Sequence, residues 1–225
     1  MDEGRGKDPG EMTERYHRWR GRKLGEQCVK SLKGRGYDAI LVPSAEAAVA
    51  AVLERVAGCE TFGLGGSVTL RSLGLIEELK VMGKTVYDHW EKGLAPDAVA
   101  ALRRRHLTCD CFLCSVNAVT VDGDIVNVDG IGNRVSAMVF GPGRVILVAG
   151  VNKIVRNLDA ALARCREVAA PMRAKSLGLD TPCGETGYCV DCKTSRRICN
   201  VTTILHRRPQ LTEMSVVLVN ERLGF

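Results

Sequence analysis

The segment from residue 117 to residue 157 places polar side chains at the ends of two strongly apolar runs. Its arginine and lysine can bind an anion, because a guanidinium offers a planar fork to a carboxylate or phosphate and an ammonium offers a point charge. Loops at strand ends are where α/β proteins hold their ligands. We therefore predict a pocket for an anionic, oxygen-rich small molecule, lined by Asn117, Asp129, Gly130, Asn133, Arg134 and Lys153.

The same residues also have a plainer interpretation. Asp129-Gly130 and Asn133 are residue types that suit turns and helix caps, and Arg134 would then pair with a nearby acid. We favour the pocket because several polar groups converge within one stretch of the chain.

A glycine-rich stretch, Gly63-Leu64-Gly65-Gly66-Ser67, lies between a strand-like run and a helical pattern. Backbone N–H groups in such a loop can approach an anion closely. The stretch is neither a Walker A loop nor a dinucleotide fingerprint, because Val68 follows it and no Gly-Lys-Ser/Thr is present. We predict ligand contact from Gly63, Gly65, Gly66 and Ser67, with a purely structural tight turn as the open alternative.

Four of the ten cysteines lie close together near the end of the chain, spaced C-x5-C-x2-C-x6-C. This spacing fits either a tetrahedral zinc site or a four-cysteine iron–sulfur cluster, such as a 4Fe–4S cluster. Free or redox-paired thiols are the alternative. The predicted metal ligands are Cys183, Cys189, Cys192 and Cys199.

Other chemistry is absent from the sequence pattern. The four histidines share neither metal-ligand nor catalytic-triad spacing, and the adjacent Glu77-Glu78 is typical of a solvated helix face. The cysteines in the apolar run CDCFLCSV are expected to be core residues.

Strand-like runs alternate with helical patterns, which predicts an α/β domain with a largely parallel sheet. A hairpin is predicted over 119–128, where Asp122-Gly123 is a strong tight-turn signal. We divide the chain into a flexible tail at 1–12 and one domain at 13–225, which includes a cysteine-rich segment at 180–200. The expected strands are 37–42, 61–62, 85–87, 109–116, 145–148 and 216–220. The expected helices are 13–33, 45–57, a stretch after Ser67 that is broken or bent near Gly74 and ends before Gly83, 97–107, 133–140 and a long one from 158.

The composition is that of a soluble protein, with 45% hydrophobic and 26% charged residues in 225. No apolar run reaches the ~18 residues needed to cross a bilayer. The N-terminus shows no apolar signal-peptide core, so we expect a cytoplasmic protein with reduced thiols. The net charge of +6 is concentrated in residues 1–35 and 171–210, but no aromatic interleaving accompanies it, so nucleic acid is not an expected partner.

Taken together in this order, three motifs resemble the lactate-utilisation (LUD) domain family. They are GLGGS at 63–67, SVNAVTVDGDIVNVDGIGNRVSAMVFGP at 115–142, and VILVAGVNKIV at 145–155. The tail TPCGETGYCVDCKTSRRICN at 181–200, followed by VVLVNERLGF, looks like the small single-domain members. The likeness covers about residues 13–225.

This resemblance implies a Rossmann-like fold similar to ribose-5-phosphate isomerase and the CoA transferases. Some members belong to an iron–sulfur-dependent system that oxidises L-lactate to pyruvate. The expected role is an accessory or subunit of such a 2-hydroxyacid oxidation system, with iron–sulfur or flavin redox proteins as partners. The alternatives are a metabolite-binding regulatory module with a structural zinc, or an enzyme like the sugar-phosphate isomerases or CoA transferases. The catalytic carboxylate of the CoA transferases has no identifiable counterpart in the sequence.

Overall fold

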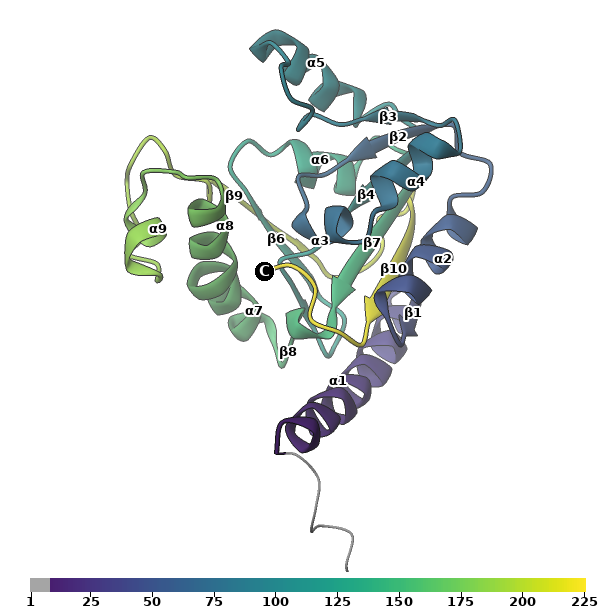
Figure 1. Ribbon diagram of the computed structural model, residues 1–225, viewed down its shortest axis with the longest axis vertical. Coiled ribbons are helices and arrows are strands. Elements are labelled where there is room, and N and C mark those ends of the chain that lie inside the picture. Colours follow the sequence, from purple (N-terminus) through teal and green to yellow (C-terminus); the bar gives the residue numbers. More distant parts are fainter. Residues whose placement is uncertain (1–8) are drawn as a thin grey trace, which may run out of the picture.

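A parallel sheet of six strands lies at the centre of the computed structural model, in which residues 9–225 are described (Figure 1). Each neighbouring pair of strands runs in the same direction. The predicted α/β fold with a parallel sheet is therefore confirmed. In spatial order the strands are β1 (Asp38–Val42), β10 (Glu213–Val219), β7 (Arg144–Gly150), β4 (Cys111–Cys114), β2 (Thr61–Leu64) and β3 (Thr85–Tyr87).

The central strands are buried on both faces, which explains their continuous apolar sequences. Along β7, Val145 and Leu147 point to one core cluster, whereas Ile146 and Val148 point to the other. Burying each such side chain contributes about 1.5–3 kcal/mol to stability. Strand β4 alternates in the same way, and its two cysteines are fully buried, as expected for core residues.

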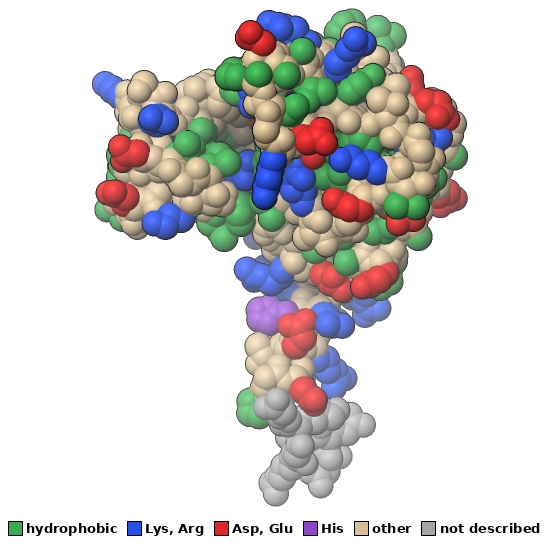
Figure 2. Space-filling view, turned by 45° about the horizontal axis from the view of Figure 1, so that its top comes forward, with side chains coloured by type: hydrophobic (Ala, Val, Ile, Leu, Met, Phe, Trp, Pro, Cys, Tyr) green, Lys and Arg blue, Asp and Glu red, His purple; other side chains and the backbone are tan. Residues whose placement is uncertain are grey.

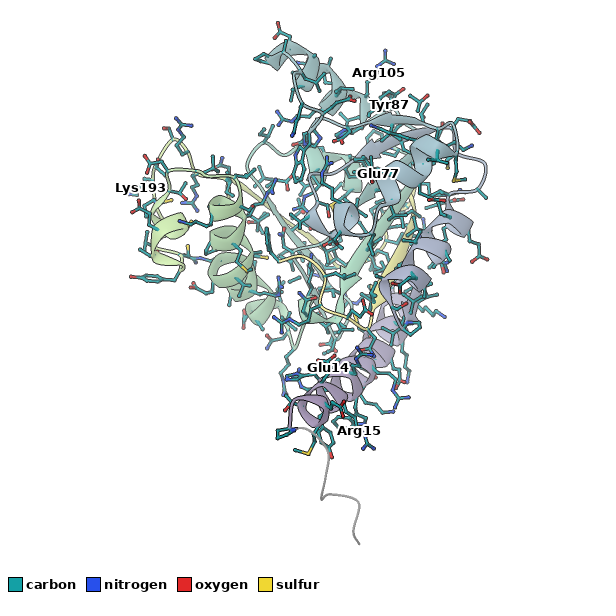
Figure 3. All side chains as sticks on the ribbon, in the orientation of Figure 1. Glu14, Arg15, Glu77, Tyr87, Arg105 and Lys193 are labelled. Atoms are coloured by element: carbon teal, nitrogen blue, oxygen red, sulfur yellow. The ribbon has the colours of Figure 1, made fainter. Side chains whose placement is uncertain are left out.

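Helices cover both faces of this sheet (Figure 1). One face packs against α1 (Pro9–Gly34) and α6 (Asn133–Val139), and the other against α2 (Ala45–Arg55), α3 (Val68–Ser72) and α4 (Leu75–Val81). The short helix α5 (Pro96–Arg105) lies beside β3 and contributes no buried residue. Glu77, on α4, is exposed, as predicted for a solvated helix face (Figure 3).

A second, smaller sheet lies beyond the carboxyl end of the first. Its strands are β8 (Ile154–Val155), β5 (Ala118–Thr120), β6 (Ile125–Asp129) and β9 (Val201–Leu205). Strands β5 and β6 form the predicted hairpin, and Gly123 in its turn has a φ of 91°, which favours glycine. A nearly continuous helix covers this sheet and ends in the direction of the cysteine-rich segment. It consists of α7 (Leu158–Arg164), a π-helical turn η2 (Cys165–Ala169) and α8 (Ala170–Ser176).

The N-terminal helix begins earlier than predicted. It starts at Pro9 rather than Thr13, with Glu11 in its first turn, so residues 9–12 belong to the helix and not to a tail. Proline and an acidic residue are both favourable in the first turn of a helix. The predicted tail at residues 1–8 lies outside the described residues. The first half of α1 extends away from the body and carries charges of both signs (Figures 1 and 2).

Two further short elements lie close to the candidate site. The 3-10 turn η1 (Val151–Lys153) follows β7, and α9 (Pro182–Thr186) lies within the cysteine-rich segment. Across residues 9–225, none of the helices combines the length and apolar character that a membrane crossing requires.

Candidate functional site

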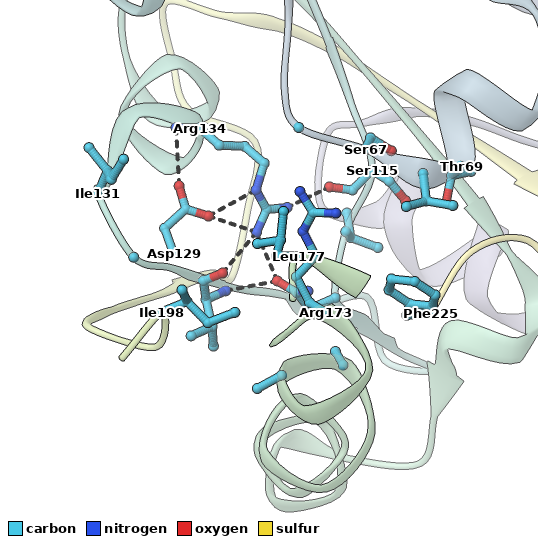
Figure 4. Close-up of a pocket in the computed structure, with 18 of the residues that line it drawn as sticks. Ser67, Thr69, Ser115, Asp129, Ile131, Arg134, Arg173, Leu177, Ile198 and Phe225 are labelled. Carbon is cyan, nitrogen blue, oxygen red and sulfur yellow. Dashed lines mark hydrogen bonds and ion pairs between the residues drawn. The ribbon is translucent and has the colours of Figure 1, made fainter. Parts of the chain in front are cut away.

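A cavity of about 280 Å³ lies at the carboxyl ends of β2, β3, β4 and β7 (Figure 4). The loops after these strands supply Ser67, Trp90, Ser115 and Lys153 to its lining. The chain leaves β2 towards α3 on one face of the sheet, whereas after β4 it forms the β5–β6 hairpin and then α6 on the other face. Loops that diverge in this way open a crevice, which is the usual ligand position in open α/β sheets.

The opposite wall comes from the long helix over the small sheet. Its π-helical turn places Cys165 and Ala169 in the lining, and α8 adds Arg173. Single π turns inside α-helices occur frequently at functional sites. Phe225 and Ile198 complete this side.

Eight of the ten predicted pocket residues line this cavity. The structure brings together residues from four separate segments that are up to 87 positions apart, between Gly66 and Lys153. Whether they bind a ligand remains a prediction. The eight residues are Gly66, Ser67, Asn117, Asp129, Gly130, Asn133, Arg134 and Lys153.

Gly63 and Gly65 do not line the cavity, and their contacts explain why they are glycine. A Cβ at Gly65 would lie 2.7 Å from the Cβ of Cys114, and one at Gly63 would lie 3.0 Å from the Cα of His106. Both residues allow close packing of neighbouring segments. At these two positions the contacts match the structural alternative for the glycine-rich stretch.

Ser67 and Gly66 occupy the lining differently. The Ser67 hydroxyl accepts a hydrogen bond from the Leu70 N–H at 3.2 Å and caps α3. A Cβ at Gly66 would lie 2.8 Å from the Trp90 ring, so glycine allows that ring to reach the cavity.

The Arg134 guanidinium is held by the protein itself. Its Nε donates to Asp129 Oδ1 at 2.9 Å, and its two terminal nitrogens donate to four further acceptors. All five N–H groups of the side chain are thereby engaged. Those four acceptors are the carbonyl oxygens of Ser115 and Val128 and the amide oxygens of Asn127 and Asn117.

Asp129 and Asn117 are committed to the same network. The second Asp129 oxygen, Oδ2, accepts from the backbone N–H groups of Arg134 and Val135 at the start of α6. The Asn117 amide oxygen also accepts from the Val128 N–H at 2.9 Å. These contacts correspond to the turn, capping and ion-pair roles of the plainer interpretation. The network fixes the rim of the cavity. Because the N–H groups of the Arg134 guanidinium are already engaged, few are left to bind a ligand.

Lys153 is the most unusual charged group in the lining. Its side chain is 3% exposed, and its Nζ donates to the hydroxyls of Ser115 at 2.9 Å and Thr69 at 3.2 Å. Within residues 9–225 it has no carboxylate partner. Burial, with the positive charges of Arg164 and Arg134, lowers the pKa of Lys153 to about 7.

Two further arginines, which the sequence analysis did not identify, also line the cavity. Arg173 lies over the Trp90 ring, 4.5 Å from its centroid, and burial lowers its pKa. Arg103 has a buried Nε with no hydrogen-bond partner. No ion pair of either side chain occurs within residues 9–225. Helical spacing was the available signal for Arg173, which follows Cys165 and Ala169 at intervals of four.

His89 adds a second buried donor or acceptor without a partner. It lines the cavity, and its Nδ1 is buried and unpaired. Burial lowers the pKa of His89 to about 4, so its ring is neutral at pH 7. Buried polar atoms without partners are rare in proteins, and a bound ligand is one way to satisfy them.

The cysteine lobe, defined as residues 180–200, lies beside this cavity. Its four cysteines are partly exposed. The Asp191 N–H donates to the Cys189 sulfur at 3.4 Å, and Asp191 has the left-handed φ of 47°. Arg197 ties the lobe together by donating to the carbonyl oxygens of Cys192 at 2.7 Å and Cys199 at 3.1 Å.

The donor types of the lobe fit a thiolate-bound metal or cluster. Burial raises the pKa of Cys199 against the opposing effect of Arg197, and the Cys189 and Cys192 thiols raise it further. Cys183 contacts the Thr181 hydroxyl at 3.6 Å. Within residues 9–225, however, no group of three or more His, Cys, Asp and Glu side chains is placed to hold a metal ion. The metal site remains a prediction.

The lobe is attached directly to the cavity rim. Asn200 donates from its backbone to Asp129 O at 2.9 Å and from its side chain to Gly130 O at 3.0 Å. Ile198, next to Cys199, is itself part of the cavity lining. A Cβ at Gly130 would lie 3.1 Å from the Cα of Ile198, so glycine allows this contact.

Comparison with known proteins identifies a family and similar solved structures. The family model of the LUD domain matches residues 25–219. The crystal structure of a DUF162 family protein from Deinococcus radiodurans is similar, with a TM-score of 0.54 and 15% identity, over 88% of this chain and 98% of that one. At this identity the likeness supports the fold alone. The comparison with curated proteins found no match.

Proposed function

The chain belongs to the LUD domain family, and from that premise we propose that it binds a small 2-hydroxy or 2-oxo carboxylate in the cavity. The family relates the protein to lactate utilisation. The proposed role is that of an accessory or subunit of an iron–sulfur-dependent L-lactate oxidation system.

The observation that carries this proposal is the charge of the cavity. Lys153, Arg173 and Arg103 line it, and no ion pair links any of them to a carboxylate within residues 9–225. Among the described lining residues Asp129 has the only acidic side chain, and both its oxygens are engaged by Arg134 and the start of α6. Unpaired buried cations favour an anionic ligand.

The size of the cavity supports a small ligand. A volume of about 280 Å³ is at the lower end of the range for binding sites, which suits a compact metabolite better than a nucleotide or a CoA thioester. The commitment of Asp129 also leaves no lining carboxylate free to act as a base. No observation therefore favours a sugar-phosphate isomerase.

The cysteine lobe supplies the second half of the proposal. Cys183, Cys189, Cys192 and Cys199 would hold an iron–sulfur cluster, which supplies one-electron transfer when bound. Its place at the rim, through Ile198, would put such a centre beside the ligand. Zinc on the same cysteines would instead make the lobe a structural part of a metabolite-binding module.

Metal and acid-labile sulfide analysis of protein purified without oxygen separates these two cases. Iron with sulfide and a broad visible absorption band supports the electron-transfer role. Zinc in equal amount to protein, with a colourless spectrum, overturns the electron-transfer role.

Calorimetric titration with L-lactate and with pyruvate tests the ligand. The Arg173→Gln variant is expected to bind at least about tenfold more weakly, a change of about 1.4 kcal/mol. Arg207→Gln, which changes an exposed arginine away from the cavity lining, is the matched control and should bind as the parent does. If neither carboxylate binds the parent, or if Arg173→Gln leaves the affinity unchanged, the ligand proposal is wrong.

A further inference from the structure

Lys153 differs from the arginines of the cavity because its amine can act as a nucleophile. We propose that Lys153 forms an imine with the carbonyl carbon of a small 2-oxo acid bound in the cavity, an inference that rests on the proposed function. Imine formation would distinguish a 2-oxo acid, such as pyruvate, from the corresponding 2-hydroxy acid, which has a hydroxyl group in place of the ketone that Lys153 would attack.

The surroundings of the Lys153 amine favour its neutral form. The side chain is almost fully buried, its ionic neighbours are the cations Arg134 and Arg164, and its hydrogen-bond partners are two hydroxyls. Burial without an anionic partner disfavours the ammonium form. With its pKa lowered to about 7, a large fraction of this amine is unprotonated at neutral pH. A desolvated lysine in this state is the usual nucleophile for carbonyl compounds.

The two hydroxyls hold the nitrogen in place. Ser115 Oγ lies 2.9 Å and Thr69 Oγ1 lies 3.2 Å from Lys153 Nζ. Ser115 directly follows β4, and Thr69 lies on α3, which follows β2. Both hydroxyls can pass protons between the nitrogen and the substrate oxygen.

The reaction balances without an oxidant or a reductant. The Nζ–carbon bond forms and the carbonyl oxygen takes up one amine hydrogen to give a carbinolamine. The carbon–oxygen bond then breaks, and the oxygen leaves as water with the second amine hydrogen.

The cavity also provides a group for the substrate carboxylate. Arg173 enters from α8, and its side chain extends into the cavity towards Arg134 and Ser115 (Figure 4). The Ser115 hydroxyl is also a hydrogen-bond partner of Lys153 Nζ. Its guanidinium has no carboxylate partner within residues 9–225. A 2-oxo acid has its carboxylate next to the carbonyl carbon, so the proposal assigns the substrate carboxylate to Arg173 and the carbonyl carbon to Lys153.

Space around the amine is preserved by a glycine. A Cβ at Gly224 would lie 2.3 Å from Thr69 Oγ1 and 3.4 Å from Lys153 Nζ, and Gly224 has a φ of 61°. Phe225 follows it and lines the cavity, and Lys153 itself is only 3% exposed. Exclusion of water in this way favours an imine over its hydrolysis.

Borohydride trapping tests the proposal directly. The parent protein is incubated with pyruvate, reduced with sodium borohydride and measured by intact mass, followed by peptide mapping. We expect one reduced pyruvate adduct per chain, on the peptide that contains Lys153. L-lactate under the same conditions should give no adduct. Lys153→Arg should abolish the adduct, and Lys175→Arg, which changes an exposed lysine on α8, should retain it.

The outcomes separate this inference from the proposed function. Pyruvate that binds by calorimetry but leaves no trapped adduct overturns the imine and leaves the carboxylate site intact. An adduct spread over several lysines, or one retained in Lys153→Arg, overturns it as well. Absence of both binding and adduct overturns the proposed function. Because the peptide map uses the parent protein, the test stands even if Lys153→Arg does not fold.

Discussion

The cavity and the cysteine lobe are adjacent, yet they are constructed in opposite ways. The polar groups of the cavity sit on the ends of buried parallel strands, and Arg134 alone donates five hydrogen bonds to neighbouring groups. The lobe contains one short helix, and its cysteines are held mainly by Arg197 and by the attachment of Asn200 to the rim. The cavity is therefore pre-arranged by the core, whereas the lobe depends on a few partly exposed contacts and on any metal that it binds.

This difference indicates which region should withstand substitution. Buried polar groups are costly to leave unpaired, whereas exposed ones can bond to water. Equivalent substitutions in the two regions should therefore differ in their effect on stability and on ligand or metal binding.

Replacing the central arginine of each region should give the largest contrast. Arg134→Ala leaves Asp129 and two amide oxygens buried without their donor, and we expect a loss of about 3–5 kcal/mol in the free energy of unfolding. Arg197→Ala removes contacts made by a side chain that is 31% exposed, and we expect a loss of under about 1 kcal/mol. Urea unfolding of both variants measures the difference. Equal losses would show that the lobe is as firmly held as the cavity.

The titration of Lys153 should give the second contrast. Its pKa is about 7 in the folded protein, against 10.5 for an unperturbed lysine, so the unfolded chain binds more protons between these two pH values. The stability of the parent should therefore rise with pH in this window, by up to about 1.4 kcal/mol per pH unit from this group. The cost of burying the charged lysine is fully present below pH 7.

The Lys153→Met variant lacks the pH dependence of stability that the lysine causes. Its free energy of unfolding should therefore exceed that of the parent most at pH 7 and least near pH 10. Urea unfolding at several pH values measures it. Lys193→Met, which changes an exposed lysine in the lobe, is the control and should follow the profile of the parent (Figure 3). Parallel profiles for the parent and Lys153→Met would contradict the lowered pKa.

Much of the cavity could be predicted because its residues follow apolar strands. The carboxyl ends of parallel strands meet at one edge, so the ends of 61–64, 111–114 and 144–150 converge whatever the intervening loops do. Helical spacing places Arg173 on one face with Cys165 and Ala169, but it does not show that this face lines the cavity, which depends on how the helix folds back over the site. The plainer interpretation includes an ion pair of Arg134 with a nearby acid, but its full set of hydrogen bonds depends on acceptors from two segments, 115–117 and 127–129.

The lobe and the edge of the small sheet were harder to predict. Strand β9 was not identified, since the apolar character of VTTIL is weak and its pairing partner β6 lies about 75 residues earlier in the chain. Cysteine spacing indicates a donor set and leaves the positions of the sulfurs open. Those positions depend on the metal itself, because ligand binding and local folding are coupled at such sites.

Serine at two lobe cysteines should affect metal content more than stability. The double variant Cys189→Ser, Cys192→Ser is expected to lose the metal and to change the free energy of unfolding by under about 1 kcal/mol. Cys28→Ser, which changes a fully buried thiol in the main core, should have the reverse effect, with metal retained and a loss of about 1–3 kcal/mol. Metal analysis and urea unfolding measure both properties. A parent protein without metal would contradict the lobe prediction.

The smallest effect is expected where the two regions meet. Asn200→Ala removes the side-chain hydrogen bonds to Gly130 O at 3.0 Å and Arg197 O at 3.2 Å, and keeps the backbone bond to Asp129 O. Because the side chain is exposed, the affinity for pyruvate should fall by about twofold to fivefold, or about 0.5–1 kcal/mol, without loss of metal. Thr202→Ala, an exposed change two residues away on β9, is the control and should leave the affinity unchanged.

A double-mutant cycle decides whether this junction couples the two regions. Calorimetry gives the pyruvate affinity of the parent, Asn200→Ala, Cys189→Ser and the double variant. If metal binding in the lobe changes the pyruvate affinity of the cavity through Asn200, the effects of Asn200→Ala and Cys189→Ser on that affinity should not be additive. We expect a departure from additivity of about 0.5 kcal/mol or more. Additive effects would mean that the cavity keeps its shape whatever the lobe binds. In that case a redox change at the cysteines could not alter ligand affinity through this contact.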